Sequence, residues 1–320
     1  LTDELPTGLT YISGVGSGWS CSSAQHVVTC VRPDPLTPAE LTTVNLKVEV
    51  RANAASTLTH APKVATEGDI TASNDSALDT TIVAVPVVNA RFIPQNFVAG
   101  DQPSVDLSLP SSFPHDIHGT LTLGFTPDAI HPVDDPAIQF STGGRNLAFT
   151  IPANTVRARF GTNTVAGPIG FQAGTVAGNI SFNGTLQTGN VETAFSSQTT
   201  IPKQAPKIHS VQRESTNGNN FLFGVRLTSS PREVTQLLLR FVGSQTRFSC
   251  GGVAGCSANG NSLTLDVRSM FDSWFIADTL NGSGSILHLP LYIDSGNSGT
   301  IEISLINRFG TSNVVRYTLP

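Results

Sequence analysis

The stretch 41–51, LTTVNLKVEVR, alternates between apolar and polar side chains over most of its length. Its apolar positions are Val44, Leu46, Val48 and Val50, and polar or charged residues stand between them. Because successive side chains of a strand point to opposite faces, this pattern predicts a strand with one buried and one wet face. Such a strand is typical of an antiparallel sheet that is covered on one side.

The same pattern, interrupted by turns, continues along all 320 residues. Charged residues make up only 13%, and 29 Gly and 20 Pro stand among many Thr, Ser, Val and Asn residues. This composition favours strands and turns over helices, so we predict an all-β protein. Strands are expected at 9–13, 19–22, 26–31, 41–51, 57–66 and 78–84, at 104–109, 119–126, 146–151 and 176–186, and at 220–228, 235–242, 262–267, 286–293, 301–306 and 314–319.

Two proline-containing junctions divide the chain. The dipeptide Val85-Pro86 is stiff, because proline fixes its own φ and biases the residue before it towards extended geometry. The stretch 201–206, IPKQAP, reads as a short semi-rigid spacer. The sequence therefore predicts three β-domains, at residues 1–84, 85–204 and 205–320.

Charge and hydropathy exclude two classes of partner. The net charge is −5 and no Lys or Arg cluster occurs, which argues against nucleic-acid binding. The sequence contains no run of 18 or more apolar residues, so no membrane-spanning helix is expected.

The four cysteines form two local pairs, Cys21 with Cys30 and Cys250 with Cys256. We predict two disulfides and an oxidising, extracellular location. The first pair is expected to face across a hairpin and to stabilise it by roughly 2.5–3 kcal/mol. A zinc site of four thiolates is the alternative, but the short gap of two to four residues that is typical of such sites is missing.

Other metal sites have weaker signals. The cluster 115–118, HDIH, resembles a metal site, but residues three apart on a strand point to opposite faces. An oxygen-rich turn at the end of a sandwich is a calcium candidate, although its spacing fits no EF-hand. Its four candidate ligands are Asp69, Asn74, Asp75 and Asp79.

The sequence carries no catalytic motif for metalloprotease, nucleotide-binding or serine-hydrolase chemistry. The acids that could serve a glycosidase are scattered, as are the few residues that could stack on a sugar. The acids are Glu192, Glu214, Glu233 and Glu302, and the aromatic residues are Trp19, Trp274, Tyr11, Tyr292 and Tyr317. We expect no enzyme activity and no cofactor.

One segment has helical periodicity. From 268 to 278, large apolar residues recur at spacings of three and four, and they are Met270, Phe271, Trp274 and Phe275. The favoured interpretation is a short helix that caps the end of a sandwich, and the alternative is an aromatic patch that grips a ligand.

Several short motifs carry a family resemblance. They are LPTGLTY at 5–11, GSGWSC at 16–21, TCVRP at 29–33 and LTP at 36–38. Over about residues 3–84 they resemble the conserved-repeat domain of large bacterial surface proteins. Residues 206–320 are similar, more loosely, to immunoglobulin-like and fibronectin-like modules. The resemblance implies tandem immunoglobulin-like β-sandwiches that form an elongated rod, secreted and with a structural or adhesive task.

The chain departs from this family at its start. Family units have additional strands before the Leu-Pro-X-Gly-Leu segment, and here only Leu1 to Glu4 precede it. A sandwich without an edge strand leaves unpaired backbone groups beside an open apolar groove. Either a strand from a neighbouring domain or another copy covers that edge, or the sequence is a fragment whose upstream residues were cut off.

Two functional hypotheses follow. The first is an extracellular structural protein of the bacterial cell surface, either an adhesive or spacer segment or a filament subunit that assembles by β-strand complementation. Its partners would be other copies of itself or neighbouring surface-protein domains. The alternative is a carbohydrate- or ligand-binding accessory module of a secreted enzyme, in which Trp274 or Tyr292 would contact the sugar.

Overall fold

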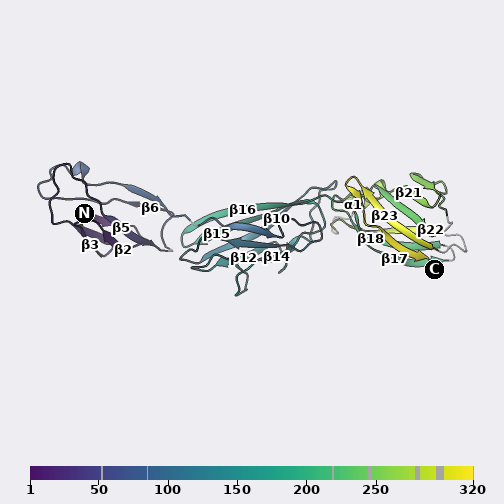
Figure 1. Cartoon of the computed structure of the whole chain (residues 1–320), viewed down its shortest axis with the longest axis horizontal. Helices are drawn as coiled ribbons and strands as arrows, with labels where there is room; N and C mark the ends of the chain where they lie inside the picture. The colour runs from purple at the N-terminus through teal and green to yellow at the C-terminus, as the bar shows by residue number, and fades with distance from the viewer. Residues whose placement is uncertain are drawn as a thin grey trace.

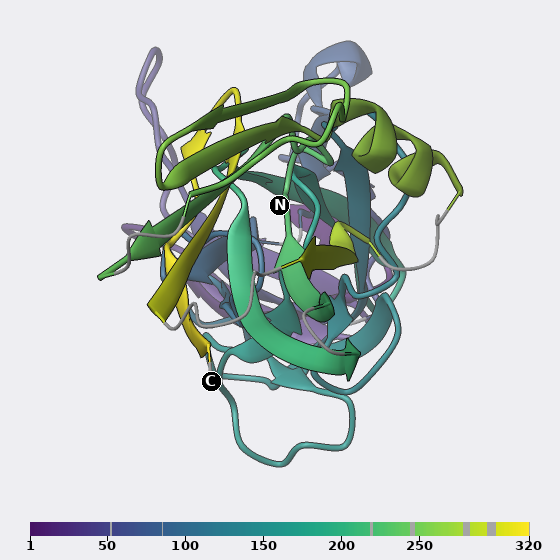
Figure 2. The same ribbon diagram turned by 90° about the vertical axis from the view of Figure 1, so that its right-hand side faces the viewer.

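Three β-domains stand in line and give the molecule an elongated shape (Figure 1). The computed structural model describes residues 1–51, 53–84, 86–217, 220–243, 247–277, 282–292 and 299–319. The two ends of the chain lie in the two outer domains, and viewed end-on the three domains overlap (Figure 2). The predicted fold class, an all-β rod of stacked sandwiches, is confirmed.

The first domain consists of three small sheets. One has the order β1 (Thr2–Glu4), β4 (Val27–Val31) and β3 (Ser20–Ala24). The second pairs β2 (Leu9–Val15) with β5 (Asn45–Val50), and the third pairs β6 (Thr57–His60) with β7 (Asp79–Ile82). A single 3-10 turn, η1 (Ala72–Asn74), lies between β6 and β7.

The middle domain is a complete two-layer sandwich. Its larger sheet has the order β13 (Arg159–Phe160), β12 (Asn146–Ile151), β10 (Ile117–Pro127), β15 (Gly178–Thr188) and β16 (Val191–Ile201). The facing sheet has the order β11 (Gln139–Phe140), β14 (Ile169–Gln172), β9 (Ser104–Ser108) and β8 (Asn89–Ile93). Only four of these strands were expected from the sequence.

The third domain is also a two-layer sandwich. One sheet has the order β17 (Lys207–Asn217), β18 (Asn220–Thr228) and β22 (Gly284–Tyr292). The other has the order β20 (Cys256–Asn259), β21 (Ser262–Asp266), β19 (Gln236–Val242), β23 (Gly299–Asn307) and β24 (Gly310–Thr311). A last strand, β25 (Val315–Leu319), pairs antiparallel with β23.

The expected helix is α1 (Arg268–Ala277), and the predicted last residue, Asp278, lies outside the described residues. Phe271 and Phe275 are buried in the core of the third domain, so the helix caps the sandwich as the favoured interpretation holds. No helix in the described ranges has the length and apolar character needed to cross a bilayer.

The three cores differ greatly in size. The described core of the middle domain has 22 fully buried hydrophobic residues and that of the third domain has 17. The first domain has a cluster of only three, Leu5, Val28 and Cys30. Most of the apolar side chains around this cluster are therefore only partly buried.

Candidate functional site: the open groove of the first domain

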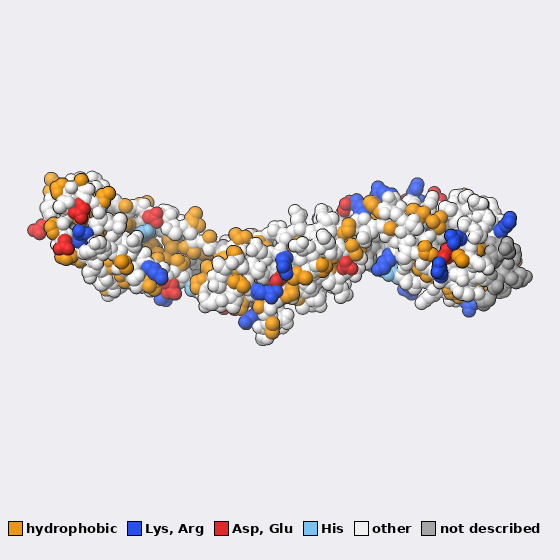
Figure 3. All heavy atoms as spheres, viewed as in Figure 1, with side chains coloured by type: hydrophobic (Ala, Val, Ile, Leu, Met, Phe, Trp, Pro, Cys, Tyr) orange, Lys and Arg blue, Asp and Glu red, His pale blue; other side chains and the backbone are white. Residues whose placement is uncertain are grey.

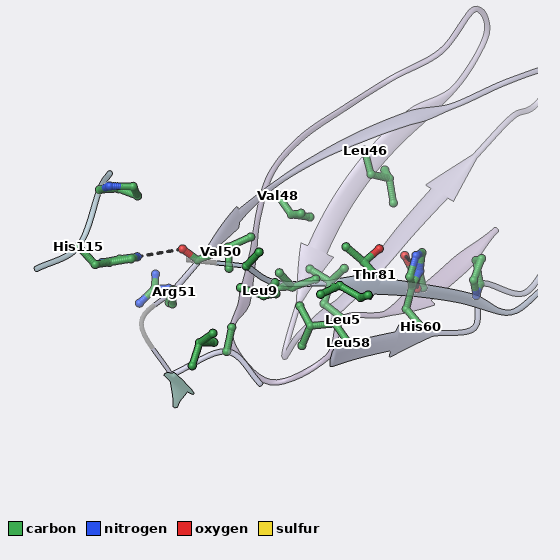
Figure 4. Close-up of a pocket in the computed structure, with 18 of the residues that line it drawn as sticks. Leu5, Leu9, Leu46, Val48, Val50, Arg51, Leu58, His60, Thr81 and His115 are labelled. Atoms are coloured by element: carbon green, nitrogen blue, oxygen red, sulfur yellow. Dashed lines mark hydrogen bonds and ion pairs between the residues drawn. The ribbon is translucent and has the colours of Figure 1, made fainter. Parts of the chain in front are cut away.

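The missing core of the first domain appears as a groove of about 650 Å³. The strands β2, β5, β6 and β7 line it, and most of the lining side chains are apolar (Figure 4). The labelled apolar lining residues are Leu5, Leu9, Leu46, Val48, Val50 and Leu58. Figure 3 shows hydrophobic side chains at the surface of this domain and around its junction with the middle domain.

The apolar side of β5 forms one wall of the groove. Leu46 and Val48 are partly buried against the small core cluster, while Val50 is still 40% exposed. On the opposite wall, Ile82 at the end of β7 is 76% exposed. The alternation that predicts a buried face in 41–51 is thus correct about which side chains share a face, but that face is only partly covered.

Two of the strands that line the groove have a free edge. Among the described residues β5 pairs only with β2, and β7 pairs only with β6. Each strand thus presents backbone N–H and C=O groups that belong to no ladder. An exposed edge of this kind is a template for pairing with another strand.

One side of the groove carries a charged cluster from three strands. The carboxylate of Asp3 is 2% exposed and lies 3.3 Å from Nδ1 of His60, and Nε2 of His60 lies 3.4 Å from Asp79. Thr81 donates a hydrogen bond to Asp79 at 3.1 Å. The cluster ties β1 to the β6–β7 hairpin, and neither the composition nor the spacing of the sequence indicated it.

Replacing His60 by leucine is expected to destabilise the first domain by about 1–3 kcal/mol, because the buried Asp3 carboxylate loses its partner. Urea unfolding followed through Trp19 emission, with Trp274 replaced by phenylalanine, measures this. The added change Asp3→Asn is expected to restore part of the loss, because a neutral amide tolerates burial better than a charge. If His60→Leu leaves the urea midpoint unchanged, the cluster contributes nothing to stability.

The middle domain closes the other end of the groove. Phe113, Pro114 and His115 come from its loop before β10, and Thr188 and Val191 come from the β15–β16 hairpin. Nε2 of His115 lies 3.0 Å from the carbonyl oxygen of Val50, at the end of β5 (Figure 4). A segment bound in the groove would therefore contact both domains.

Both cysteine pairs form disulfides in the structure. Cys21 and Cys30 are directly opposite each other on β3 and β4, with their Cα atoms 4.1 Å apart. Trp19 packs on the same cluster and donates a hydrogen bond from Nε1 to Thr42 at 2.9 Å. Cys250 and Cys256 close a loop that leads into β20.

The side chains of the calcium candidates contact different neighbours. Asp69 accepts a hydrogen bond from the backbone N–H of Thr71, and Asp79 belongs to the His60 cluster. In the described part of the chain, no three His, Cys, Asp or Glu residues lie together as a metal site would require. The structure therefore adds no support for calcium at Asp69, Asn74, Asp75 and Asp79.

The polar side chains of the 115–118 segment, HDIH, also contact separate partners. His115 contacts Val50 in the first domain, while Nδ1 of His118 lies 3.2 Å from the Thr150 hydroxyl on the neighbouring strand. The carboxylate of Asp116 accepts a hydrogen bond from the backbone N–H of Ala153. Each side chain has a local structural partner, and the two histidines do not converge.

Three of the four scattered glutamates pair with basic neighbours. Glu214 lies 2.8 Å from His288, Glu233 lies 3.1 Å from Arg308, and Glu302 lies between two arginines of neighbouring strands. These contacts are typical of charges on a sheet surface and at its edges. They give no pair of carboxylates that faces a common cleft.

The aromatic candidates for sugar binding lie apart. Trp274 donates a hydrogen bond from Nε1 to the carbonyl of Gly284, at the start of β22. Tyr292 is 68% exposed and ends the same strand. Eight residue steps of a strand separate the two ends by about 26 Å, so Trp274 and Tyr292 do not form one platform.

Comparisons with known proteins do not identify a family for this chain. No family model and no curated protein matches the sequence. A solved type II cohesin dyad from the ScaA scaffoldin of Acetivibrio cellulolyticus aligns at 8% identity and a TM-score of 0.23, over 72% of this chain and 95% of that one.

Two further structures align just as weakly. Escherichia coli alpha-2-macroglobulin has 12% identity and a TM-score of 0.23, over 93% of this chain and 26% of that one. A DUF4785 family protein from Legionella pneumophila has 10% identity and a TM-score of 0.20, over 92% of this chain and 64% of that one. At these TM-scores none of them bears on function, and the resemblance to the conserved-repeat domain remains a prediction.

Proposed function

We propose that this chain is part of an extracellular structural protein of the bacterial cell surface, and that it assembles by accepting a β-strand into the groove of the first domain. Its role is to space or join other modules, not to catalyse a reaction. The partner is an extended segment with apolar residues at every second position. Such a segment can belong to another copy of the chain or to a neighbouring surface-protein domain.

The observation that carries this proposal is the apolar groove lined by β5 and β7, each of which pairs with only one strand among the described residues. An incoming strand gains backbone hydrogen bonds to β5 or β7, and its alternate side chains fill the apolar space between them. Burial of apolar surface stabilises by roughly 25 cal/mol per Å². Complementation by a strand therefore supplies the core that the first domain lacks.

Three further features support a structural role. The domains stand in line, so the chain holds its two ends far apart (Figure 1). Two disulfides favour an oxidising environment outside the cytoplasm. Glu214, Glu233 and Glu302 pair with basic neighbours, which is typical of surface stabilisation and not of a catalytic centre.

A synthetic peptide with the sequence of residues 44–51, VNLKVEVR, tests strand acceptance because it has the required alternation and is soluble. We expect it to bind the full chain and to raise the urea midpoint of the first domain. A control peptide with serine at the four apolar positions is expected not to bind. Isothermal titration calorimetry and Trp19 emission measure the two effects.

A matched pair of variants locates the binding site. Ile82→Lys places a charge in the groove and is expected to weaken peptide binding at least tenfold. Leu78→Lys changes a residue of similar exposure in the same hairpin that does not line the groove, and binding is expected to persist. Equal affinity of the two variants would place the peptide elsewhere and overturn the proposal.

A further inference from the structure

The middle and third domains interlock through backbone hydrogen bonds. The N–H of Ala177 donates to the carbonyl of Ser230 at 2.8 Å, and the N–H of Ile130 donates to the carbonyl of Pro231 at 3.1 Å. Both pairs cross from one domain to the other. A joint made from fixed backbone groups resists rotation more than one made from long side chains, because fewer torsions are free.

A pair of small side chains adds a second contact across the same joint. The N–H of Ser283 donates to Oγ1 of Thr175 at 2.8 Å, and Oγ of Ser283 donates to the carbonyl of Thr175 at 2.6 Å. Ser283 is fully buried. Thr175 is in turn held by Asp135, a 1% exposed carboxylate that also accepts hydrogen bonds from the backbone of Ala137 and Val176.

Arg232 lies at the centre of the joint with no exposed surface. Its Nε donates to the carbonyl of Gly282 in its own domain at 2.9 Å. Its Nη1 donates to the carbonyls of His131 at 2.5 Å and Val133 at 2.8 Å in the middle domain. The guanidinium thus binds three backbone carbonyls from two domains.

Two properties of Arg232 indicate that this position is enforced by its surroundings. Its φ of 52° lies in the left-handed region, which a non-glycine residue occupies only when the structure around it requires this. Burial lowers the pKa of the guanidinium, and the carboxylates of Asp135 and Asp134 oppose that shift. The hydrogen bonds of Nη1 to His131 and Val133, which stabilise this arrangement, exist only while the two domains are docked.

The linker between the two domains is tied to the same joint. The N–H of Gln204 donates to Oγ of Ser230 at 3.0 Å, and its carbonyl accepts from Nδ2 of Asn307 at 2.9 Å. At the surface Lys203 lies 2.6 Å from Asp128. The stretch 201–206, expected to be a semi-rigid spacer, is therefore fixed to its neighbours.

Among the described residues, fewer hydrogen bonds cross the joint between the first and middle domains. In the described ranges its hydrogen bonds are those of His115 to the carbonyl of Val50 and of Asn190 to the carbonyl of Asn53, the latter at 3.3 Å. Neither uses a fully buried side chain, since Asn190 is exposed and His115 is partly buried. Such contacts break without leaving a buried polar group unpaired, so their loss costs little.

We infer that the middle and third domains form one rigid unit locked by Arg232, and that the rod bends at the joint between the first and middle domains. Because opening the second joint separates the buried guanidinium from the carbonyls of both His131 and Val133, these contacts are lost together. The groove that accepts a strand then lies beside the bending joint.

Distances between spin labels on the full chain test this inference. All described cysteines are in disulfides, so introduced cysteines can be labelled selectively. Gln198→Cys with Gln212→Cys reports on the second joint, and Lys47→Cys with Gln198→Cys reports on the first. We expect the distance distribution across the first joint to be at least twice as broad as that across the second. Equal widths in the otherwise unchanged chain overturn the inference.

Arg232→Met removes the hydrogen-bond donors and keeps the apolar stem. It is expected to broaden the 198–212 distribution at least twofold, while Arg240→Met, on the exposed face of the third domain, leaves it unchanged. Trp274 emission checks that the third domain is folded. If Arg232→Met does not fold, Thr175→Val weakens the same joint from the other side and is expected to broaden the distribution as well. A narrow distribution in a folded joint variant contradicts the role of the lock.

Discussion

Replacing both Cys21 and Cys30 by serine is expected to unfold most of the first domain under conditions in which the other two domains stay folded. In the chain-entropy model a loop of this length contributes roughly 2.5–3 kcal/mol. A small core rarely supplies more than about 3–5 kcal/mol, and the cluster here has three fully buried members, one of which is Cys30. The loss is therefore comparable to the whole stability of the domain.

The second disulfide provides the matched control. Replacing Cys250 and Cys256 by serine opens a loop with a sequence separation of only 6, beside a domain with a large core. We expect the third domain to remain folded. Trp19 emission in a chain with Trp274→Phe reports on the first domain, and Trp274 emission in a chain with Trp19→Phe reports on the third. The chain-entropy losses of the two loops are similar, so the test is whether the domain unfolds. A first domain that stays folded without Cys21–Cys30 would show that its small core is sufficient.

The substitution Phe182→Ala is expected to cost the middle domain about 3–5 kcal/mol, which is the range for a buried phenylalanine. Phe182 has no exposed surface and its ring centroid lies 5.1 Å from that of Phe171 and 5.5 Å from that of Phe92. These rings come from both sheets, so no single movement can fill the cavity. Edge-to-face contacts with Phe171 are lost in addition.

Hydrogen exchange measured by mass spectrometry follows this loss in strand β15, because the middle domain has no tryptophan. Protection there is expected to fall by about two to three and a half orders of magnitude, since every 1.4 kcal/mol is tenfold. Val165→Ala changes a residue that is 79% exposed and is expected to leave protection unchanged. A Phe182→Ala chain that keeps its protection would show that the core repacks around the cavity.

The strands that the sequence predicts best are those with alternating or continuous apolar residues. Strand β10, for example, alternates Leu121 and Leu123, both buried, with Thr120 and Thr122. Strand β16 was missed because it is an edge strand whose side chains are mostly polar on both faces, with only Val191 and Ile201 buried. Hydrophobic periodicity does not detect a strand in which so few side chains are buried.

The candidate site also has one part that the sequence indicates and other parts that it does not. The alternation in 41–51 predicts an apolar face on one side of this strand, and that face lines the groove beside β5. The cluster of Asp3, His60 and Asp79 has no sequence signal, because its members are 57 and 19 positions apart and converge only when β1 packs on the hairpin. The sequence likewise gives no signal that Arg232 is buried, because its burial depends on the packing of two domains around it.

The sequence by itself determined that the chain is all β and that its cysteines pair locally. These properties depend on neighbours in the chain, namely side-chain alternation and short loops. Only the tertiary structure decided how small the core of the first domain is, which polar side chains meet in its groove, and which joint is rigid. Those outcomes depend on which surfaces remain uncovered and which charges become buried, and both are properties of the packed molecule.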